Sequence, residues 1–499
     1  MRKLLAFILL VAYFAAPSAA FAADAPRPNI IFFLADDLGY GDVGCFGQTK
    51  IHTPNIDGLA AEGMRFTAHY AGNNVCAPSR CVLMTGLHPG HTYIRDNRER
   101  KDYPEGQEPV PANYLTLPLT LKKLGYATGA FGKWGLGPIG TSGDPINQGI
   151  DHFYGYNCQA VAHNYFPTHL WDNDTRIALN NPEFSAYQQL SAGADPNDPK
   201  TYARYLGTQY APDLVGEQAR KFVRDNKDHP FFLYYPTTVP HLALQVPDDS
   251  LKEYEGQFPE EPYRGDRNYL PNRTPRATYA AMVTRMDRDL GRLIDLVHEL
   301  GLDDRTIIIF ASDNGPLYDK LGGTDADFFQ SAGIFRGRKG SMYEGGIRIP
   351  CIVRWQNRVA AGAVNSRVTG FEDWLPTLLD LIGATDSIPA KIDGISFAPT
   401  LLGQPQTERP FLYRESPGYS GQQSIRVGDW KAVRQHLAPG PRAALQPGAI
   451  ELYDLKNDPS ETKDVAAANA DVVRRLAALM AQQHVPSAVF PMRALDGAP

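Results

Sequence analysis

The sequence predicts an α/β fold: a large, mostly parallel sheet sandwiched by helices, followed by a smaller C-terminal domain of antiparallel sheet plus helix. Two observations support the large sheet. Short apolar runs of strand length are each followed by polar or glycine-rich residues, and segments with helical periodicity lie between them. The runs cover residues 29–35, 128–131, 231–235, 306–311 and 351–355. Uninterrupted apolar character is typical of parallel strands that helices cover on both faces.

The helical segments between these runs are amphipathic. The clearest covers residues 278–300, where apolar side chains recur every three or four positions, at Met282, Val283, Met286, Leu290, Leu293, Ile294 and Val297. This spacing places them along one face of a helix. Strands that alternate with such helices favour a sheet with helices on both faces.

The alternation of apolar strands and amphipathic helices ends near residue 402. Residues 404–409 form a polar linker, and the short runs after it predict a small antiparallel sheet, with strands at residues 411–414, 424–427, 430–433 and 450–454. A final helix over residues 466–482 is expected to pack on this sheet. We therefore expect a main domain of residues 23–402 and a small α+β domain of residues 403–499.

Residues 1–22 have the organisation of a secretory signal peptide. Arg2 and Lys3 give a basic start, residues 4–16 are apolar, and Ala20 and Ala22 form a small-x-small cleavage pattern. The alternative is a membrane anchor, but the apolar stretch is too short to span a bilayer comfortably. The sequence predicts an exported protein, periplasmic or secreted, without a stable membrane anchor.

The charged residues and the cysteines exclude several classes of binding partner and site. The chain has 49 basic and 55 acidic residues and no block of lysine or arginine, so we expect no binding of nucleic acid. The cysteines are odd in number and irregularly spaced, at Cys45, Cys76, Cys81, Cys158 and Cys351. This pattern is not typical of a disulfide framework or a zinc site, so at least one cysteine has another role.

Polar side chains follow the first four predicted strands. These are Asp36 and Asp37, then Lys133, then His241, and finally Asp313 and Asn314. Ligands of open α/β sheets bind beyond the carboxyl ends of the strands, so we expect these side chains at one edge. Carboxylate and amide oxygens are ligands that calcium and magnesium prefer. The alternative is that the two acidic pairs only form turns.

Cys76 begins the run CAPSRCVLMTG at residues 76–86. An inert buried thiol and a thiolate nucleophile are the ordinary interpretations of a free cysteine, and neither explains the Pro-Ser-Arg that follows. The run resembles the C-x-P-S-R-x-x-L-x-T-G signature of type I sulfatases, in the alkaline phosphatase superfamily. In that family a separate maturation enzyme converts the cysteine to Cα-formylglycine, an aldehyde.

The resemblance covers essentially the whole mature chain. It includes residues 28–44, 125–137, 312–315 and 335–350. It implies an alkaline phosphatase-like fold and a formylglycine-dependent hydrolase that releases inorganic sulfate. The implied partners are a sulfated substrate and a formylglycine-generating enzyme.

The resemblance also implies a metal site. Asp36, Asp37, Asp313 and Asn314 would bind calcium together with the formylglycine derived from Cys76. Magnesium is possible as well, because it accepts the same oxygen ligands.

The remaining roles concern the sulfate. By resemblance, Arg80 and Lys133 would steady the aldehyde hydrate and the sulfate, while His241 and Lys339 would grip the sulfate and assist the leaving oxygen. One hydroxyl of the hydrate would attack sulfur, and the second would collapse to the aldehyde and expel sulfate. Fixed cations suit this reaction, because negative charge grows on the ester oxygens as the S–O bond breaks.

One motif departs from the family pattern. Many members have G-K-W-H-L-G, whereas this chain has a glycine, Gly135, in place of the histidine that serves as presumed base. Either another histidine, His163 or His91, reaches the same point, or the protein binds a sulfated glycan without turnover.

Residues 151–171 and 91–97 resemble segments of exported carbohydrate sulfatases. We therefore expect substrate contacts from His91, Arg95 and His163, and a galactose or N-acetylgalactosamine sulfate as the substrate. A phosphatase or phosphodiesterase of the same superfamily is the competing enzyme, but such relatives commonly use Ser or Thr with two zinc ions. A noncatalytic sulfoglycan-binding protein is the competing binding function.

Overall fold

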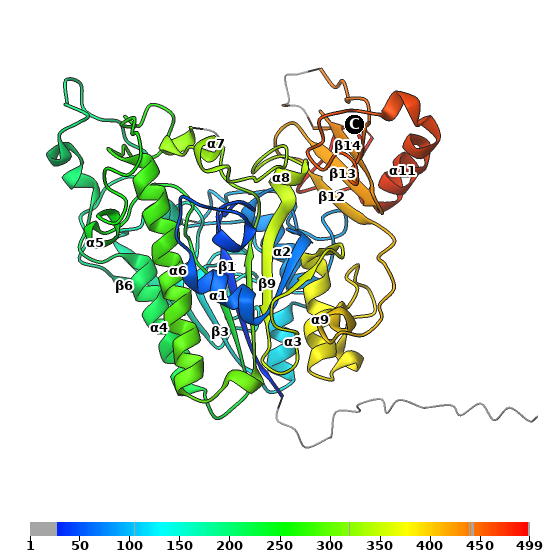
Figure 1. The fold of residues 1–499 in the computed structure, drawn as a ribbon, viewed down its shortest axis with the longest axis horizontal. Helices are drawn as coiled ribbons and strands as arrows, with labels where there is room; N and C mark the ends of the chain where they lie inside the picture. Colours follow the sequence, from blue (N-terminus) through cyan, green and yellow to red (C-terminus); the bar gives the residue numbers. More distant parts are fainter. Residues whose placement is uncertain (1–26, 104, 319, 439, 441–443, 498–499) are drawn as a thin grey trace, which may run out of the picture.

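The computed structural model describes residues 27–497 except 104, 319, 439 and 441–443. The predicted signal peptide, residues 1–22, lies outside the described residues. In the part of the chain that is described, no helix is both long and apolar enough to cross a membrane. A large sheet between layers of helices forms the main body, and a small second sheet lies beside it (Figure 1).

Among the described residues the main sheet has eleven strands, in the order β10-β2-β9-β8-β1-β7-β3-β4-β5-β6, with β11 paired to β2. The strands are β1 (Asn29–Ala35), β2 (Met64–Tyr70), β3 (Ala127–Lys133), β4 (His152–Tyr156), β5 (His169–Asp172), β6 (Thr175–Ala178), β7 (Phe231–Pro236), β8 (Thr306–Ser312), β9 (Arg348–Arg354), β10 (Ala363–Asn365) and β11 (Thr369–Gly370). The central strands β8, β1, β7, β3 and β4 are parallel, which confirms the predicted fold class.

Helices cover both faces of this sheet, whereas the last helix of the chain packs on the small sheet. The helices of the described residues are α1 (Pro54–Glu62), α2 (Cys76–Thr85), α3 (Leu117–Lys123), α4 (Ala211–Asp225), α5 (Asp248–Leu251), α6 (Pro275–Glu299), α7 (Ala326–Phe329), α8 (Glu344–Ile347), α9 (Trp374–Leu381), α10 (Ala398–Leu401) and α11 (Ala470–Gln483). Side chains alternate along β1, so Ile31 and Phe33 pack with α1, α4 and α6, while Phe32 and Leu34 pack with α2, α3 and α9. Each face of the sheet therefore has its own apolar core.

The direction of β9 differs from the prediction. Residues 351–355 were expected to form another parallel strand, but β9 pairs antiparallel with both β8 and β2. In its described residues, the connection from β8 contains only a 3-10 turn (Leu321–Gly323) and the short helices α7 and α8, and the chain re-enters the sheet from the carboxyl end of β8. Because β9 is buried on both faces, its apolar pattern is the same in either direction.

The small sheet consists of β12 (Leu412–Ser416), β13 (Gln422–Val427), β14 (Trp430–Gln435) and β15 (Glu451–Asp454), with all neighbours antiparallel. Leu476 and Met480 of α11 pack on its apolar face with Ile425 and Leu452. The helix expected from residue 466 begins as a 3-10 turn (Ala466–Ala468), and α11 starts at Ala470. The boundary at residues 402 and 403 stays a prediction.

Candidate active site

The polar residues that follow the parallel strands meet at one edge of the main sheet. Asp36 and Asp37 follow β1, Lys133 is the last residue of β3, and Asp313 and Asn314 follow β8, the parallel neighbour of β1. All five side chains are buried. The parallel arrangement explains this meeting, because the carboxyl ends of neighbouring strands coincide.

Helix α2 carries Cys76 to the same edge. Cys76 is its first residue, and the Cys76 Sγ atom lies 3.5 Å from Asp36 Oδ1 and 3.3 Å from Lys339 Nζ. Arg80 lies one turn further along, so its side chain extends from the same face of the helix. Its Nη2 atom is 2.8 Å from Asp313 Oδ2. The Cys-x-x-x-Arg spacing thus places the sulfur and the guanidinium beside the strand-end carboxylates.

Each carboxylate of this site has a cationic neighbour. Lys133 Nζ is 2.7 Å from Asp36 Oδ2, and Lys339 Nζ is 2.8 Å from Asp37 Oδ2. Burial disfavours ionisation of Asp36, but the charges of Lys133 and Arg80 outweigh it and hold the pKa of Asp36 below its ordinary value. Burial raises the pKa of Asp313 to about 6, and the nearby charge of Asp36 adds to this rise.

The oxygen atoms of the site fit a hard divalent cation. Asp36, Asp37 and Asp313 supply carboxylates, and Asn314 supplies an amide whose Nδ2 atom lies 2.7 Å from Asp37 Oδ1. Asn314 Oδ1 is buried and accepts no hydrogen bond from any residue that the structure describes. Such an orphaned buried acceptor is costly unless it has a partner, and a cation would satisfy it. The donor set suits calcium or magnesium, which prefer oxygen ligands.

Two histidines stack beside this cluster. His241 Nε2 lies 3.4 Å from Asp37 Oδ2, while its Nδ1 donates to the Leu242 carbonyl oxygen at 2.8 Å. The ring of His163 is parallel to that of His241, with a centroid distance of 4.7 Å and an interplanar angle of 2°. Burial lowers the pKa of both rings well below the ordinary value of 6.5, and neighbouring cationic groups lower it further. Both rings are therefore neutral near pH 7.

Gly135 leaves space that another side chain fills. Its φ angle is +76°, and a Cβ added there would lie 3.1 Å from Gln159 Nε2. Gln159 Nε2 lies 3.4 Å from Asn97 Oδ1, which accepts a hydrogen bond from the Ala77 N–H at 3.0 Å. Gln159 and Asn97 are not among the site residues predicted from sequence, although both lie in segments assigned to substrate. Their proximity to residue 76 depends on loop packing that no local motif encodes.

His91 and Arg95 have other partners. His91 Nδ1 is 2.9 Å from Asp393 Oδ1, and the buried Arg95 donates from Nη1 to Glu415 Oε1 at 2.8 Å. Glu415 belongs to β12, so Arg95 ties the main body to the small sheet. Neither side chain has a recorded contact with Cys76 or its neighbours in the described part of the chain. Their role toward substrate stays a prediction.

Comparison with known proteins gives a consistent family assignment. The Sulfatase family model matches residues 28–384, and the model of the N-sulphoglucosamine sulphohydrolase C-terminal region matches residues 332–485. The chain is similar to N-acetylgalactosamine-6-O-sulfatase of Bacteroides thetaiotaomicron, with 30% identity over 91% of this chain and 92% of that protein. It is 32% identical to human arylsulfatase A, over 92% of this chain and 88% of that protein. Among solved structures, Ps i-CgsB matches with a TM-score of 0.71 and 28% identity, covering 91% of this chain and 92% of the other.

Proposed function

The chain belongs to the sulfatase family, and we propose that it releases inorganic sulfate from a galactose or N-acetylgalactosamine sulfate within a carbohydrate. The observation that carries the reaction is the position of Cys76 between the oxygen ligands and Lys339. The names of two similar proteins support this choice of sugar. One is named N-acetylgalactosamine-6-O-sulfatase, and i-CgsB was solved in complex with k-i-k-neocarrahexaose.

Residue 76 is proposed to act as formylglycine, not as a thiol. Burial raises the pKa of the Cys76 thiol, and the nearby Lys133 and Lys339 offset this only in part. A thiol with a raised pKa is a poor nucleophile, because the thiolate is the reactive form. When present, calcium would supply Lewis-acid stabilisation at Asp36, Asp37, Asp313 and Asn314, and formylglycine would supply a hydrated aldehyde as the nucleophile.

Charge balance favours an anionic substrate. Asp36, Asp37 and Asp313 are matched by Arg80, Lys133 and Lys339 in number. A divalent cation held by the same carboxylates makes the pocket positive, which attracts a sulfate ester even though the whole chain is acidic. Lys133 and Lys339 stabilise the charge that grows on the sulfate oxygens as the S–O bond breaks.

His241 is suited to the leaving oxygen. Its Nδ1 proton is fixed on the Leu242 carbonyl, so Nε2 is the atom that faces the site. An anionic ester nearby favours the protonated ring, because opposite charges stabilise each other. His241 then donates the Nε2 proton to the departing alcohol.

We assign the base that the family places at the position of Gly135 to His163. Its ring stacks on His241, and its lowered pKa keeps it neutral and able to accept a proton. His163 Nδ1 contacts the Tyr187 hydroxyl, while Nε2 has no recorded partner among the described residues. The second candidate function, binding without turnover, is favoured only by the glycine at position 135.

Mass spectrometry of the tryptic peptide of residues 66–80, from protein made in its native host, tests the modification directly. Formylglycine at residue 76 is the expected result. An unmodified cysteine, in a host that matures another sulfatase, would overturn this mechanism. Fully converted protein that binds sulfated sugars but releases no sulfate would favour the binding function.

The variant His163→Gln tests the base. We expect kcat for sulfate release to fall by about 100-fold with little change in KM, since general bases contribute this much or more. His152→Gln is the matched control, because His152 is paired with Asp172 on β5 and has no recorded contact with the site among the described residues. Equal kcat values for His163→Gln and wild type would exclude His163 as the base.

A further inference from the structure

Helix α2 carries residue 76 at its first position, and the residue before it provides no cap. Val75 has an apolar side chain, which accepts no hydrogen bond from the first turn. Pro78 has no N–H group, and the Ser79 N–H donates to the Val75 carbonyl oxygen at 3.2 Å. Ala77, the second helical residue, is buried, and at that position a helix offers no carbonyl oxygen to the N–H. The Ala77 N–H therefore needs an acceptor from another part of the chain.

Asn97 provides this acceptor from a different loop. Its Oδ1 atom accepts a hydrogen bond from the Ala77 N–H at 3.0 Å. Asparagine is among the preferred capping residues, because its short amide side chain reaches the free N–H groups of a first turn. Since this cap is not part of the helix sequence, the position of the loop of residues 91–98 is coupled to the position of residue 76.

This loop is held in place from two sides. The buried Arg95 donates from Nη1 to Glu415 Oε1 of β12 at 2.8 Å. The Arg95 carbonyl oxygen accepts a hydrogen bond from Asn73 Nδ2 at 3.4 Å, and Asn73 belongs to the segment that leads into α2. Asn97 follows closely after this anchored arginine, which limits the movement of its side chain.

Gln159 fixes the orientation of the Asn97 amide. The side chain of Asn97 is exposed, but Gln159 is buried and donates from Nε2 to Asn97 Oδ1 at 3.4 Å. Two donors thus share one oxygen atom, which leaves a single favourable orientation for this amide. Gly135 makes room for the arrangement, because a Cβ at that position would lie 3.1 Å from the same Gln159 nitrogen. An amide does not titrate near neutral pH, so Gln159 acts through hydrogen bonding and not as a base.

We propose that Asn97 is a positioning residue for the nucleophile at residue 76, and that Gln159 acts through Asn97. This inference rests on the proposed function at residue 76. The hydrogen bond to the Ala77 N–H fixes the first turn of α2, and with it the direction of the side chain of residue 76. A misaligned nucleophile reacts slowly even when the substrate is bound. The effect therefore appears in kcat and not in KM.

The kinetic test uses N-acetylgalactosamine 6-sulfate as the probe and counts only protein molecules with formylglycine at residue 76. Asn97→Leu removes the acceptor at nearly the same size, and we expect kcat to fall about tenfold with KM unchanged. Gln159→Met keeps the length of the side chain but removes the donor, and we expect a fall of about threefold. The double variant is expected to match Asn97→Leu, because Gln159 has no effect once Asn97 is lost.

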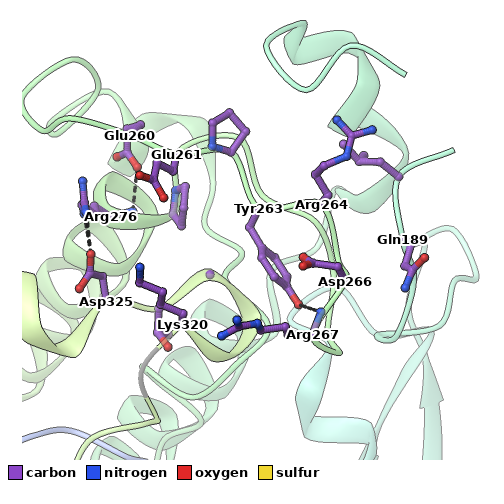
Figure 2. Close-up of a pocket in the computed structure, with 15 residues that line it drawn as sticks. Gln189, Glu260, Glu261, Tyr263, Arg264, Asp266, Arg267, Arg276, Lys320 and Asp325 are labelled. Atoms are coloured by element: carbon purple, nitrogen blue, oxygen red, sulfur yellow. Dashed lines mark hydrogen bonds and ion pairs between the residues drawn. The ribbon is translucent and has the colours of Figure 1, made fainter. Parts of the chain in front are cut away.

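Two control variants separate positioning from general stability. Asn226→Leu also loses a hydrogen bond at a helix end, since Asn226 Nδ2 donates to the Phe222 carbonyl oxygen of α4 at 2.8 Å. Gln189→Met makes the same exchange as Gln159→Met, in the wall of a cavity that residues 260–264 and 323–325 also line (Figure 2). We expect both controls to keep the kcat of wild type. An unchanged kcat in Asn97→Leu, or equal falls in Asn97→Leu and Asn226→Leu, would overturn the positioning role. A further threefold loss in the double variant would overturn the action of Gln159 through Asn97.

Hydrogen exchange of the Ala77 amide, measured by mass spectrometry on protein with unmodified Cys76, separates this inference from the proposed function. We expect exchange about tenfold faster in Asn97→Leu than in wild type, and close to wild type in Asn97→Asp, which keeps the acceptor. If wild type with formylglycine releases no sulfate from the probe, the proposed function has failed. Faster exchange in Asn97→Leu alone then still supports the anchoring of residue 76 by Asn97, and equal exchange in all three proteins contradicts it.

Discussion

Two groups of buried charges can be compared in this molecule. The active-site cluster contains Asp36, Asp37, Asp313, Arg80, Lys133 and Lys339. The junction cluster, where the main body meets the small sheet, contains Glu372, Asp373, Arg409 and Arg414. In each cluster the carboxylates are matched by cations, and the side chains have little contact with solvent. Burial and pairing alone therefore do not identify the catalytic site.

The pKa values do not separate the two clusters either. At the junction, burial opposes ionisation of Glu372, but Arg414 and Arg409 lower its pKa to about 2. Burial raises the pKa of Asp373 to about 6, as it does for Asp313 in the active site.

The difference lies in what else the cations contact. Arg414 also donates to the carbonyl oxygens of Ala71 and Tyr413, so the protein itself uses its donors. Lys339 instead faces Cys76 Sγ, the position that an oxygen of the proposed formylglycine would take. Asn314 Oδ1 is a buried acceptor that has no hydrogen-bond partner among the described residues. A buried cluster whose polar groups are not all used by the protein is the better indicator of a ligand site.

The largest effect is expected from Cys76→Ser. A serine can accept the sulfuryl group but has no second hydroxyl to expel sulfate, so turnover falls by about 10⁴-fold or more. Sulfate release under multiple-turnover conditions measures this, with thermal unfolding to show that the fold is retained. Sustained turnover by this variant would contradict the mechanism.

At the junction, Arg414→Met is expected to lower the free energy of unfolding by about 3 kcal/mol, because Glu372 loses a buried partner. Urea unfolding measures the loss, and kcat per folded molecule stays close to that of wild type. The control is Arg474→Met on the exposed face of α11, for which we expect a change under about 0.5 kcal/mol. If kcat per folded molecule of Arg414→Met falls well below that of wild type, the junction cluster also supports the active-site cluster, and this prediction is wrong.

Calcium is expected to stabilise the protein through the active-site cluster alone. At a free concentration of about 100 times Kd, the gain in the free energy of unfolding is about 2.7 kcal/mol. Thermal unfolding with calcium or magnesium chloride measures it. Asn314→Leu is expected to lose most of the gain, whereas Arg414→Met keeps it. An equal gain in wild type and Asn314→Leu would argue against Asn314 as a ligand.

The smallest expected effect is the contribution of His484 to the pH dependence of stability. His484 Nδ1 lies 2.8 Å from Glu415 Oε2, and its Nε2 lies 2.8 Å from Asp496 Oδ1. Burial lowers its pKa, but hydrogen bonds and charge from these two acids outweigh it, so the pKa is raised above 6.5. The protonated His484 therefore stabilises the folded state fully below pH 6.5, and this stabilisation is lost as pH rises through the higher folded-state pKa of His484. We expect about 1 kcal/mol less stability at pH 8.5 than at pH 6 from this group. Urea unfolding of His484→Gln at both pH values checks this, since the variant lacks that contribution.

Much of the fold could be predicted because its signals are local. Four of the five apolar runs are central parallel strands, and the four runs after residue 402 form the small sheet. The predicted helix over residues 278–300 is most of α6. The sequence could not reveal the direction of β9, because a strand buried on both faces has the same pattern in either direction.

The sequence by itself predicted the chemistry that we propose at residue 76, through a run of fixed residue types, and it identified the oxygen-bearing side chains that follow β1 and β8. These features depend on neighbours along the chain and on the ends of parallel strands. Only the tertiary structure decided that His163 stacks on His241, that Gln159 fills the space at Gly135, and that Arg95 binds Glu415. These contacts join segments far apart in sequence, and their geometry follows from packing, which residue types and spacing do not encode.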